Sequence, residues 1–558
     1  MRTRRPNILR AVPYLVWALL LALTGCGGRS GSAERDPRPN VLLIVADDLG
    51  YTDLGVYGGE IGTPNLDALA RQGVMFTDFH ASSTCSPSRA MLLSGVDNHL
   101  AGLGTMAHDQ TPEQLGQPGY EGYLSFRVAA LPELLRDAGY HTLMTGKWHL
   151  GLTEETSPAA RGFERSFGLM DGGAGHFDEL PLFAGGRPIF RENGKQVALP
   201  GDFYSTRDYA ERMIDFIDES RHDGKPFFAY LSFTAPHWPL QAPDASIARF
   251  AGRYDDGYDA LHARRVERLR QLGLVPAEAE AYPGLPWRER WDDLDPERRK
   301  IESRKMEVYA AMVHDLDVYV GRVLEHLRRT GLYENTFILF MSDNGAEGHD
   351  LQAIWPDLED HIRNCCDNSY ENMGRGNSYI DYGPEWARAG IGVSSLYKAF
   401  STQGGILVPA FASFPGVLPG ERVSRSFATV MDVMPTILDL AGVEHPGERY
   451  QGRDVFPMQG RSMLPLLRGE TETVHGPEPV MGWELFGRRA VRRGDWKLTF
   501  TTKPYGPGEW RLFDLATDPA ELNDRSARHP EIRRQLVELW DRYAADNNVI
   551  LPTVDLPY

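Results

Sequence analysis

Continuous apolar runs, separated by helical patterns, constrain the fold of this chain more than any other feature. Residues 41–46 (VLLIVA) and 336–342 (TFILFMS) are two such runs. A run of this kind is typical of a strand buried on both faces of a parallel sheet. Further strands are expected at 74–81, 141–149 and 226–234, and helices at 63–73, 131–140, 206–220 and 302–330. This alternation predicts an α/β fold with a large, mostly parallel but mixed central sheet flanked by helices.

Acidic and amide side chains follow two of these runs where each strand is expected to end. Asp47 and Asp48 follow the first run, and Asp343 and Asn344 follow the other. Because ligand sites in open α/β sheets lie beyond the carboxyl ends of strands, we expect the two pairs to share a site. Their oxygens suit a hard divalent cation, Ca²⁺ or Mg²⁺, which would also offset the repulsion between the carboxylates. Either pair alone could instead cap a helix or a turn.

Four basic side chains lie near other expected strand ends or turns. Lys147 and His149 occur in TGKWHLG, two residues apart, so in extended geometry both side chains face the same way. His237 occurs in TAPHWPLQAP, and Lys398 precedes a Gly-Gly turn. Taken singly, these residues have ordinary interpretations: a solvated basic pair, a packed loop histidine and a surface lysine.

The run SSTCSPSRAMLLSG places Cys85 and Arg89 four residues apart where a loop is expected to enter a helix. Residues at this spacing share a helical face. The N–H groups of a first turn and the helix dipole favour an anion. A nucleophile here, flanked by a guanidinium, is placed to receive sulfate or phosphate. The alternative is a buried structural cysteine that precedes a helix.

A second, smaller unit is predicted after Gly452. Residues 480–486, 488–500 and 509–518 are typical of antiparallel strands, and 530–547 of a helix. We therefore predict a catalytic domain over 39–455 and a C-terminal α+β subdomain over 456–558.

The first residues are typical of an export signal. A basic stretch and a short apolar core precede Leu23-Thr24-Gly25-Cys26, which resembles the lipobox of bacterial lipoproteins. We predict a signal peptide over 1–25, a lipid on Cys26 that binds the membrane, and a polar tether over 26–38. The protein is then exported, as a periplasmic or cell-surface lipoprotein. An ordinary signal peptide with a chance cysteine is the alternative.

Charge and cysteine content exclude some classes of function. The 558 residues carry a formal net charge of −18, which argues against non-specific nucleic-acid binding. Of four cysteines, Cys365 and Cys366 are adjacent. Adjacent cysteines bridge only with strain, so we expect no disulfide framework. Cys365 and Cys366 also lack the spaced partners of a zinc site.

The motif C-S-P-S-R at 85–89 resembles the C-x-P-S-R signature of the type I sulfatases, within the alkaline phosphatase superfamily. GKWHLG at 146–151 resembles a second sulfatase signature, and segments such as 367–379 and 482–498 resemble bacterial arylsulfatases. The resemblance implies that a maturation enzyme oxidises Cys85 to formylglycine. It further implies hydrolysis of sulfuric esters, with aryl sulfates as the expected small-molecule substrates.

The same resemblance implies roles for the residues singled out above. Asp47, Asp48, Asp343 and Asn344 would bind one Ca²⁺, with Mg²⁺ as the alternative. The hydrated aldehyde at position 85 would attack sulfur, and Arg89 would hold the hydrate and the metal ligands in place. Lys147, His237 and Lys398 would bind the sulfonate and leaving oxygens, where negative charge develops. His237 or Lys398 would protonate the leaving group, and His149 would be the base that re-forms the aldehyde.

Two other functions stay open at this stage. A phosphonate monoester or phosphodiester hydrolase could use the same aldehyde, because sulfate and phosphate esters are similar in size and charge. Without the maturation step, the chain would instead be a non-catalytic, Ca²⁺-binding surface lipoprotein.

Overall fold

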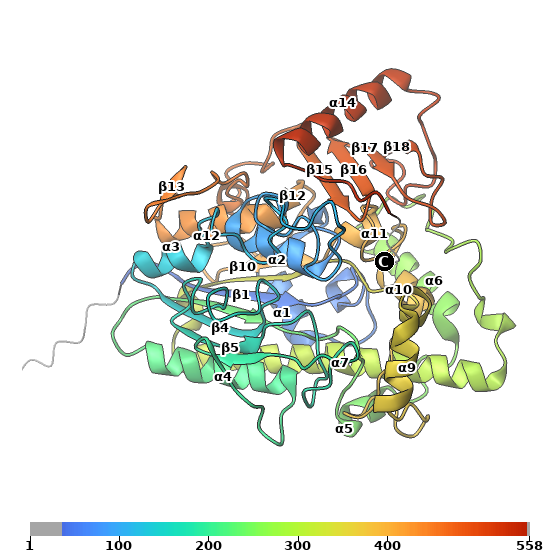
Figure 1. Ribbon diagram of the computed structural model, residues 1–558, viewed down its shortest axis with the longest axis horizontal. Coiled ribbons are helices and arrows are strands. Elements are labelled where there is room, and N and C mark those ends of the chain that lie inside the picture. The colour runs from blue at the N-terminus through green and yellow to red at the C-terminus, as the bar shows by residue number, and fades with distance from the viewer. Residues whose placement is uncertain (1–35, 555–558) are drawn as a thin grey trace, which may run out of the picture.

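A ten-stranded mixed sheet forms the centre of the protein (Figure 1). The structure is a computed structural model, and it describes residues 36–554. In spatial order the strands are β11 (Arg422–Ser424), β2 (Val74–Phe76), β10 (Ala410–Ser413), β9 (Thr336–Ser342), β1 (Asn40–Ala46), β8 (Phe227–Ser232), β4 (His141–Lys147), β5 (Arg165–Leu169), β6 (Phe190–Glu192) and β7 (Lys195–Gln196). Strands β9, β1, β8, β4 and β5 run parallel, whereas β10 and β6 are antiparallel to the neighbours that join them to this group. The predicted mostly parallel, mixed sheet is confirmed.

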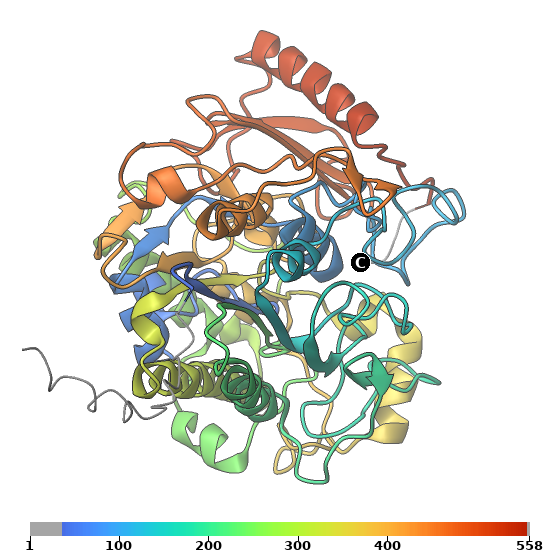
Figure 2. The same ribbon diagram turned by 90° about the vertical axis from the view of Figure 1, so that its left-hand side faces the viewer.

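Both faces of the sheet are buried because alternate side chains of each central strand enter different cores. In β1, Val41 and Leu43 join the core on one face, whereas Leu42 and Ile44 join the core on the other. One face is covered by helices α1 (Pro64–Arg71), α4 (Ser205–Ser220) and α7 (Pro296–Arg329), and the other by α2 (Cys85–Ser94), α3 (Leu131–Asp137) and α12 (Val433–Ala441), as Figure 2 shows. This arrangement explains why the strand segments are apolar throughout rather than alternating.

Some element boundaries differ from the predicted ones. The strand expected over 74–81 is interrupted, since β2 belongs to the main sheet and β3 (Phe79–His80) pairs with β12 (Ala428–Thr429) in a separate ladder. Helix α7 begins before the expected 302, because the Asp295 side chain accepts hydrogen bonds from the N–H groups of Glu297 and Arg298 and caps the helix there.

The C-terminal part contains a four-stranded antiparallel sheet, as predicted. Its strands are β15 (Val480–Leu485), β16 (Arg488–Arg493), β17 (Trp496–Phe500) and β18 (Trp510–Asp514), in that order. Helix α14 (Pro530–Asp546) covers the outer face through Leu536 and Trp540. Trp483 and Ala490 on the inner face join the core of the main sheet. The sheet therefore packs directly on the larger domain (Figure 1). The boundary at 455 stays a prediction.

Shorter elements complete the fold. The helices are α5 (Asp244–Ile247), α6 (Gly257–Gln271), α8 (Leu351–Ile354), α9 (Pro356–Cys365), α10 (Gly383–Gly390), α11 (Gln403–Ile406) and α13 (Leu464–Leu467), with 3-10 turns at Gly55–Tyr57, Ala248–Phe250, Trp291–Asp293, Tyr333–Asn335 and Val430–Asp432; β13 (Arg449–Tyr450) and β14 (Arg453–Asp454) form a hairpin. Within residues 36–554, none of the helices combines the length and apolar character that a membrane crossing requires. The predicted signal peptide, Cys26 and most of the tether lie outside the described residues.

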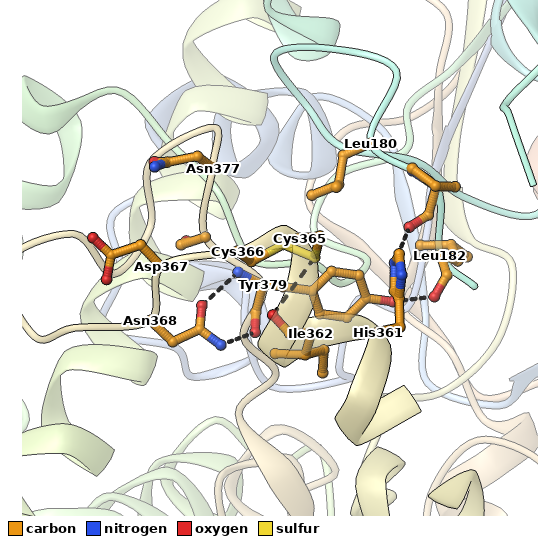
Figure 3. The surroundings of a disulfide bond; sticks show 12 residues. Leu180, Leu182, His361, Ile362, Cys365, Cys366, Asp367, Asn368, Asn377 and Tyr379 are labelled. Carbon is orange, nitrogen blue, oxygen red and sulfur yellow. Dashed lines mark hydrogen bonds between the residues drawn. A yellow bond between two sulfur atoms is a disulfide. The ribbon is translucent and has the colours of Figure 1, made fainter. Parts of the chain in front are cut away.

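The adjacent cysteines bridge each other, although this one disulfide is not the framework that the sequence argued against. Cys365 and Cys366 form a disulfide at the carboxyl end of α9 (Figure 3). The chain turns sharply there, since the Cys366 N–H still donates to Ile362 O while Cys366 itself is extended. A cysteine count cannot reveal such a local turn. Cys85 is the one free thiol in the described part of the chain.

Candidate active site

The carboxyl edge of the main sheet forms the floor of a cavity of about 390 Å³. Cys85, His149, His237 and Lys398 all line it. They come from the start of α2, the end of β4, the loop after β8 and the segment before α11, which are far apart in sequence. No residue of the segment 250–300 is among the residues that line the cavity.

The two acidic pairs meet because β1 and β9 are neighbours in parallel register. Ala46 pairs with Ser342, so Asp47 and Asp343 leave the sheet side by side. The Asp48 N–H donates to Asp343 Oδ1 at 3.3 Å, and Asn344 Nδ2 donates to Asp48 Oδ1 at 2.7 Å. Asp48 adopts a left-handed conformation with φ 63° directly after the strand. The structure thus places all four predicted metal ligands in one buried cluster.

This donor set fits a hard divalent cation. Asn344 Oδ1 is buried without a hydrogen-bond partner in the structure, as expected of an oxygen reserved for a ligand. Ligand atoms of Asp47, Asp48, Cys85 and His237 all lie within 4.8 Å of one another. Burial and the neighbouring Asp47 carboxylate raise the pKa of Asp343 to about 6. The positive charge of a bound cation would offset both effects, because it stabilises the ionised carboxylates.

Arg89 points at the acidic cluster instead of the cavity. Cys85 begins α2 and Arg89 follows one turn later, so both project from the same side of the helix. The Arg89 Nε and Nη2 atoms lie 2.8 and 2.7 Å from Asp343 Oδ2, and Nη1 donates to Lys147 O at 3.1 Å. Arg89 is fully buried and does not line the cavity. This geometry agrees with the expected task of Arg89, which is to hold a metal ligand in place.

The Cys85 side chain sits directly over the acidic pair. Its Sγ lies 3.4 Å from Asp47 Oδ1 and 3.9 Å from Asp48 Oδ1. Burial raises the pKa of the thiol well above its usual value, although Lys147 and Lys398 act in the opposite direction. A neutral thiol is a weak nucleophile. The unmodified side chain is therefore poorly suited to attack an ester.

Lys147 and Lys398 each pair with one carboxylate of the first acidic pair. Lys147 Nζ lies 2.7 Å from Asp47 Oδ2, and Lys398 Nζ lies 2.9 Å from Asp48 Oδ2. Both lysines are buried. Two ammonium groups therefore flank the position of the Cys85 side chain, where an oxyanion would be stabilised.

The two histidines are neutral for the same physical reason. Burial lowers the pKa of His237 to about 3 and that of His149 well below its usual value. His237 Nδ1 donates to Trp238 O at 2.5 Å, which leaves Nε2 as an acceptor, 3.5 Å from Asp48 Oδ2. His149 follows β4 in a left-handed conformation (φ 54°) and lines the cavity.

The sequence interpretation missed four residues beside the site. Glu347 Oε2 lies 3.2 Å from Lys398 Nζ, and its Oε1 accepts a hydrogen bond from His349 Nδ1 at 2.7 Å. Burial alone would raise the pKa of Glu347, but Lys398 and His349 lower it to well below its usual range. Glu347 and His349 lie close to Asn344 in the run DNGAEGH, and this closeness was the signal available in the sequence.

Gly172 and Gly173 are the other two missed residues. A Cβ on Gly172 would lie 2.8 Å from His149 Cε1, and one on Gly173 would lie 3.1 Å from His237 Cε1. The absent side chains allow this segment to cover both histidines. The paired glycines in MDGGAG were the signal.

The upper wall of the cavity is apolar. Met170, Leu182, Phe183, Trp238 and Trp355 line it, and the rings of Phe183 and Trp355 pack edge to face at 5.2 Å.

The segment that carries Leu182 is held from outside the wall. Tyr379 OH donates to Leu182 O at 2.7 Å, and His361 Nε2 lies 3.1 Å from Pro181 O (Figure 3). The side chain of Asn368 pairs with both backbone groups of Tyr379. The region around the disulfide thus supports one side of the cavity.

Comparison with known proteins identifies the family. The family profile described as Sulfatase matches residues 39–443, which is most of the chain. The chain belongs to the sulfatase family. A second profile, described as N-sulphoglucosamine sulphohydrolase, C-terminal, matches residues 395–545.

Relatives of this sulfatase extend along nearly the whole chain. An uncharacterised sulfatase of Schizosaccharomyces pombe is 46% identical, covering 92% of this chain and 94% of its own. An arylsulfatase of Klebsiella aerogenes is 40% identical, and the match covers 77% of this chain and 92% of the relative. The crystal structure of Ps i-CgsB superposes with a TM-score of 0.66 at 25% identity, and the match covers 92% of this chain and 94% of that chain. Together these matches make the chain a sulfuric ester hydrolase of the type I sulfatase group.

Proposed function

We propose that this sulfatase hydrolyses aryl sulfates with a formylglycine derived from Cys85 and one bound Ca²⁺. The observation that supports the proposal best is the position of Cys85. Its side chain is within 3.9 Å of two carboxylates, and each of these carboxylates pairs with a buried ammonium group. The overall reaction adds water to the ester and yields an alcohol or phenol and sulfate.

The bound cation would be held by Asp47, Asp48, Asp343 and Asn344, through three carboxylates and the unpartnered Oδ1 of Asn344. An all-oxygen donor set favours Ca²⁺ or Mg²⁺ over softer metals. When bound, it supplies positive charge next to position 85 and lowers the pKa of oxygen acids there.

A formylglycine hydrate supplies a hydroxyl nucleophile and a second hydroxyl whose deprotonation releases sulfate. Lys147 and Lys398 bind the sulfonate oxygens and stabilise the charge that develops on them. Neutral His149 accepts a proton at a ring nitrogen, because burial keeps it unprotonated. Lys398 is the candidate donor to the leaving oxygen in this geometry, and His237 becomes one only when its Nε2 is protonated. Gly172, Gly173 and the wall above them exclude water.

The apolar wall supports aryl sulfates as the substrate class. Phe183, Trp238 and Trp355 offer rings on which an aryl group stacks. The Klebsiella aerogenes relative, an arylsulfatase, agrees with this assignment.

We also propose that the protein is exported and anchored to a membrane through a lipid on Cys26. The apolar core before Leu23-Thr24-Gly25-Cys26 supports export and lipidation of Cys26. A maturation enzyme must act on Cys85 for the site to turn over. Labelling with a radioactive fatty acid, compared with Cys26→Ala, tests the anchor.

The decisive experiment measures the mass of the peptide around Cys85 and then the sulfatase activity of the intact protein. Native protein should contain formylglycine and hydrolyse 4-nitrophenyl sulfate, whereas Cys85→Ser should fold but not turn over. A matured enzyme that hydrolyses no sulfate ester would refute the proposal. A kcat/KM that is higher for the phosphate or phosphonate ester of the same phenol would favour that hydrolase instead. An unmodified thiol in native material would favour the non-catalytic lipoprotein.

A further inference from the structure

The C-terminal sheet contacts the segment that carries Lys398 into the active site. Residues 395–403, which we term the lysine segment, lie between α10 and the first residue of α11 in the sequence. On the cavity side, the Lys398 N–H donates to Ala346 O at 3.0 Å and the Ala399 N–H donates to Ser83 O at 2.7 Å. The segment thereby joins the Asn344 loop to the Cys85 loop.

The backbone around Lys398 is strained. Leu396 and Ala399 both adopt left-handed conformations, with φ 56° and 69°. Neither residue is glycine, so each conformation has a free-energy cost that surrounding contacts must offset. Without that offset, the segment would relax and the Lys398 ammonium would leave its position beside Asp48.

Arg488 at the start of β16 supplies contacts that hold this conformation. Its Nη1 donates to Ala399 O at 3.0 Å, and its guanidinium lies 3.9 Å from the ring centre of Phe400. Ser401 Oγ donates back to Arg488 O at 3.1 Å. Arg488 is 3% exposed, so these charge-assisted contacts are shielded from water.

A second buried group holds the two ends of the lysine segment. Glu521 Oε2 accepts hydrogen bonds from Gln403 N at 2.7 Å and from Ser395 Oγ at 3.2 Å. Lys497 Nζ on β17 lies 2.8 Å from Glu521 Oε1 and compensates its charge. The two ends and the middle of the segment are thus held from the C-terminal part.

We propose that Arg488 is a positioning residue for catalysis: it holds the lysine segment in its strained form and so keeps Lys398 aimed at the cavity. The inference rests on the proposed function, because it takes Lys398 as a group that stabilises the reacting sulfate. The C-terminal sheet is then part of the catalytic apparatus, although Arg488 touches no substrate.

The test uses Arg488→Met, which keeps a long apolar side chain and removes the donors. With matured enzyme and 4-nitrophenyl sulfate, we expect kcat to fall by about 10- to 100-fold with little change in KM. Arg488→Lys should keep a higher kcat than Arg488→Met, although lower than that of wild type. The matched control is Arg489→Met, because Arg489 is next on the same strand but stacks on Phe500, at 3.7 Å, away from the lysine segment. The control should keep its kcat.

A double-mutant cycle separates positioning from a general loss of structure. In the Lys398→Ala background, Arg488→Met should cause no further loss, because the group that it positions is gone. A loss in that background equal to the loss in wild type would overturn the inference, as would equal effects of Arg488→Met and Arg489→Met. In either case the wild-type activity would still support the proposed function.

Hydrogen exchange gives a readout that needs no turnover. Arg488→Met should increase exchange at the Lys398 and Ala399 amides and leave α2 unchanged. Unchanged exchange at these two amides would also overturn the inference, even in protein that had not been matured.

Discussion

Arg89 and Asp343 form a buried ion pair in which Arg89 Nη2 lies 2.7 Å from Asp343 Oδ2. Both side chains are nearly inaccessible to solvent. The pair connects the helix that presents Cys85 to the strand that ends in the acidic cluster. It therefore couples the position of Cys85 to that of the carboxylates.

Removing the guanidinium should be costly for stability. Arg89→Met leaves the Asp343 carboxylate buried without its partner, and we expect the free energy of unfolding to fall by about 3–5 kcal/mol. Urea denaturation monitored by tryptophan fluorescence measures this. Arg534→Met, which removes an exposed i,i+4 ion pair with Glu538, is the control and should change little. Equal effects of the two variants would contradict the structural role given to Arg89.

Metal removal should destabilise the protein through the acidic cluster. After chelation, Ca²⁺ at 100 times its dissociation constant should restore about 2.7 kcal/mol of stability. Asn344→Ala removes the buried Oδ1 that has no hydrogen-bond partner and is proposed to bind the cation, so it should weaken Ca²⁺ binding and reduce this gain at the same Ca²⁺ concentration. Asn335→Ala, far from the site, serves as the control. Calcium content by elemental analysis that is unchanged in Asn344→Ala would count against the assignment.

Stability should decline at alkaline pH because of His99. His99 Nδ1 lies 2.8 Å from Asp97 Oδ1, and Nε2 lies 3.1 Å from Glu484 Oε2 on β15. Burial lowers the pKa of His99, but hydrogen bonds to the two carboxylates outweigh it and raise the pKa to about 9. Because the folded-state pKa is above the ordinary value, the contribution is complete below about pH 6.5 and is lost as pH rises through about 9.

Urea midpoints from pH 6 to 10 measure this effect. A shift of this size corresponds to at most about 3 kcal/mol. Tyr543, which donates to Asp97 Oδ2, and other groups also titrate at high pH. The difference between wild type and His99→Gln isolates the histidine. Parallel pH profiles for the two proteins would refute the prediction.

The apolar wall should determine preference among sulfate esters. Trp355→Ala removes a ring that lines the cavity, so kcat/KM for naphthyl sulfate should fall by roughly tenfold, whereas that for a short alkyl sulfate should change much less. Trp287→Ala is the control, because Trp287 is 54% exposed. A similar loss for both esters would mean that Trp355 does not contact the aryl group.

The apolar runs determined the central fold and part of the site. A strand buried on both faces requires apolar side chains throughout, so the positions of Asp47 and Asp343 at strand ends followed directly from the sequence. Their meeting depends on the parallel pairing of β1 with β9, which is usual in such sheets. One shared acidic site was therefore predictable from the sequence alone.

Other features needed the tertiary structure. Helical spacing put Cys85 and Arg89 on one face, but it could not reveal that Asp343 occupies the space beside Arg89. The Cys365–Cys366 disulfide depends on a local turn that no composition encodes.

The sequence by itself determined the α/β class, the oxygen-rich strand ends and the sulfatase resemblance, because these depend on residues that are neighbours along the chain. Only the tertiary structure decided where each cationic side chain points and which contacts hold it there. Arg488 and Lys398 are 90 positions apart in this sequence, yet a strained segment brings them together. Such contacts arise from packing between distant segments, and local sequence patterns carry no record of that packing.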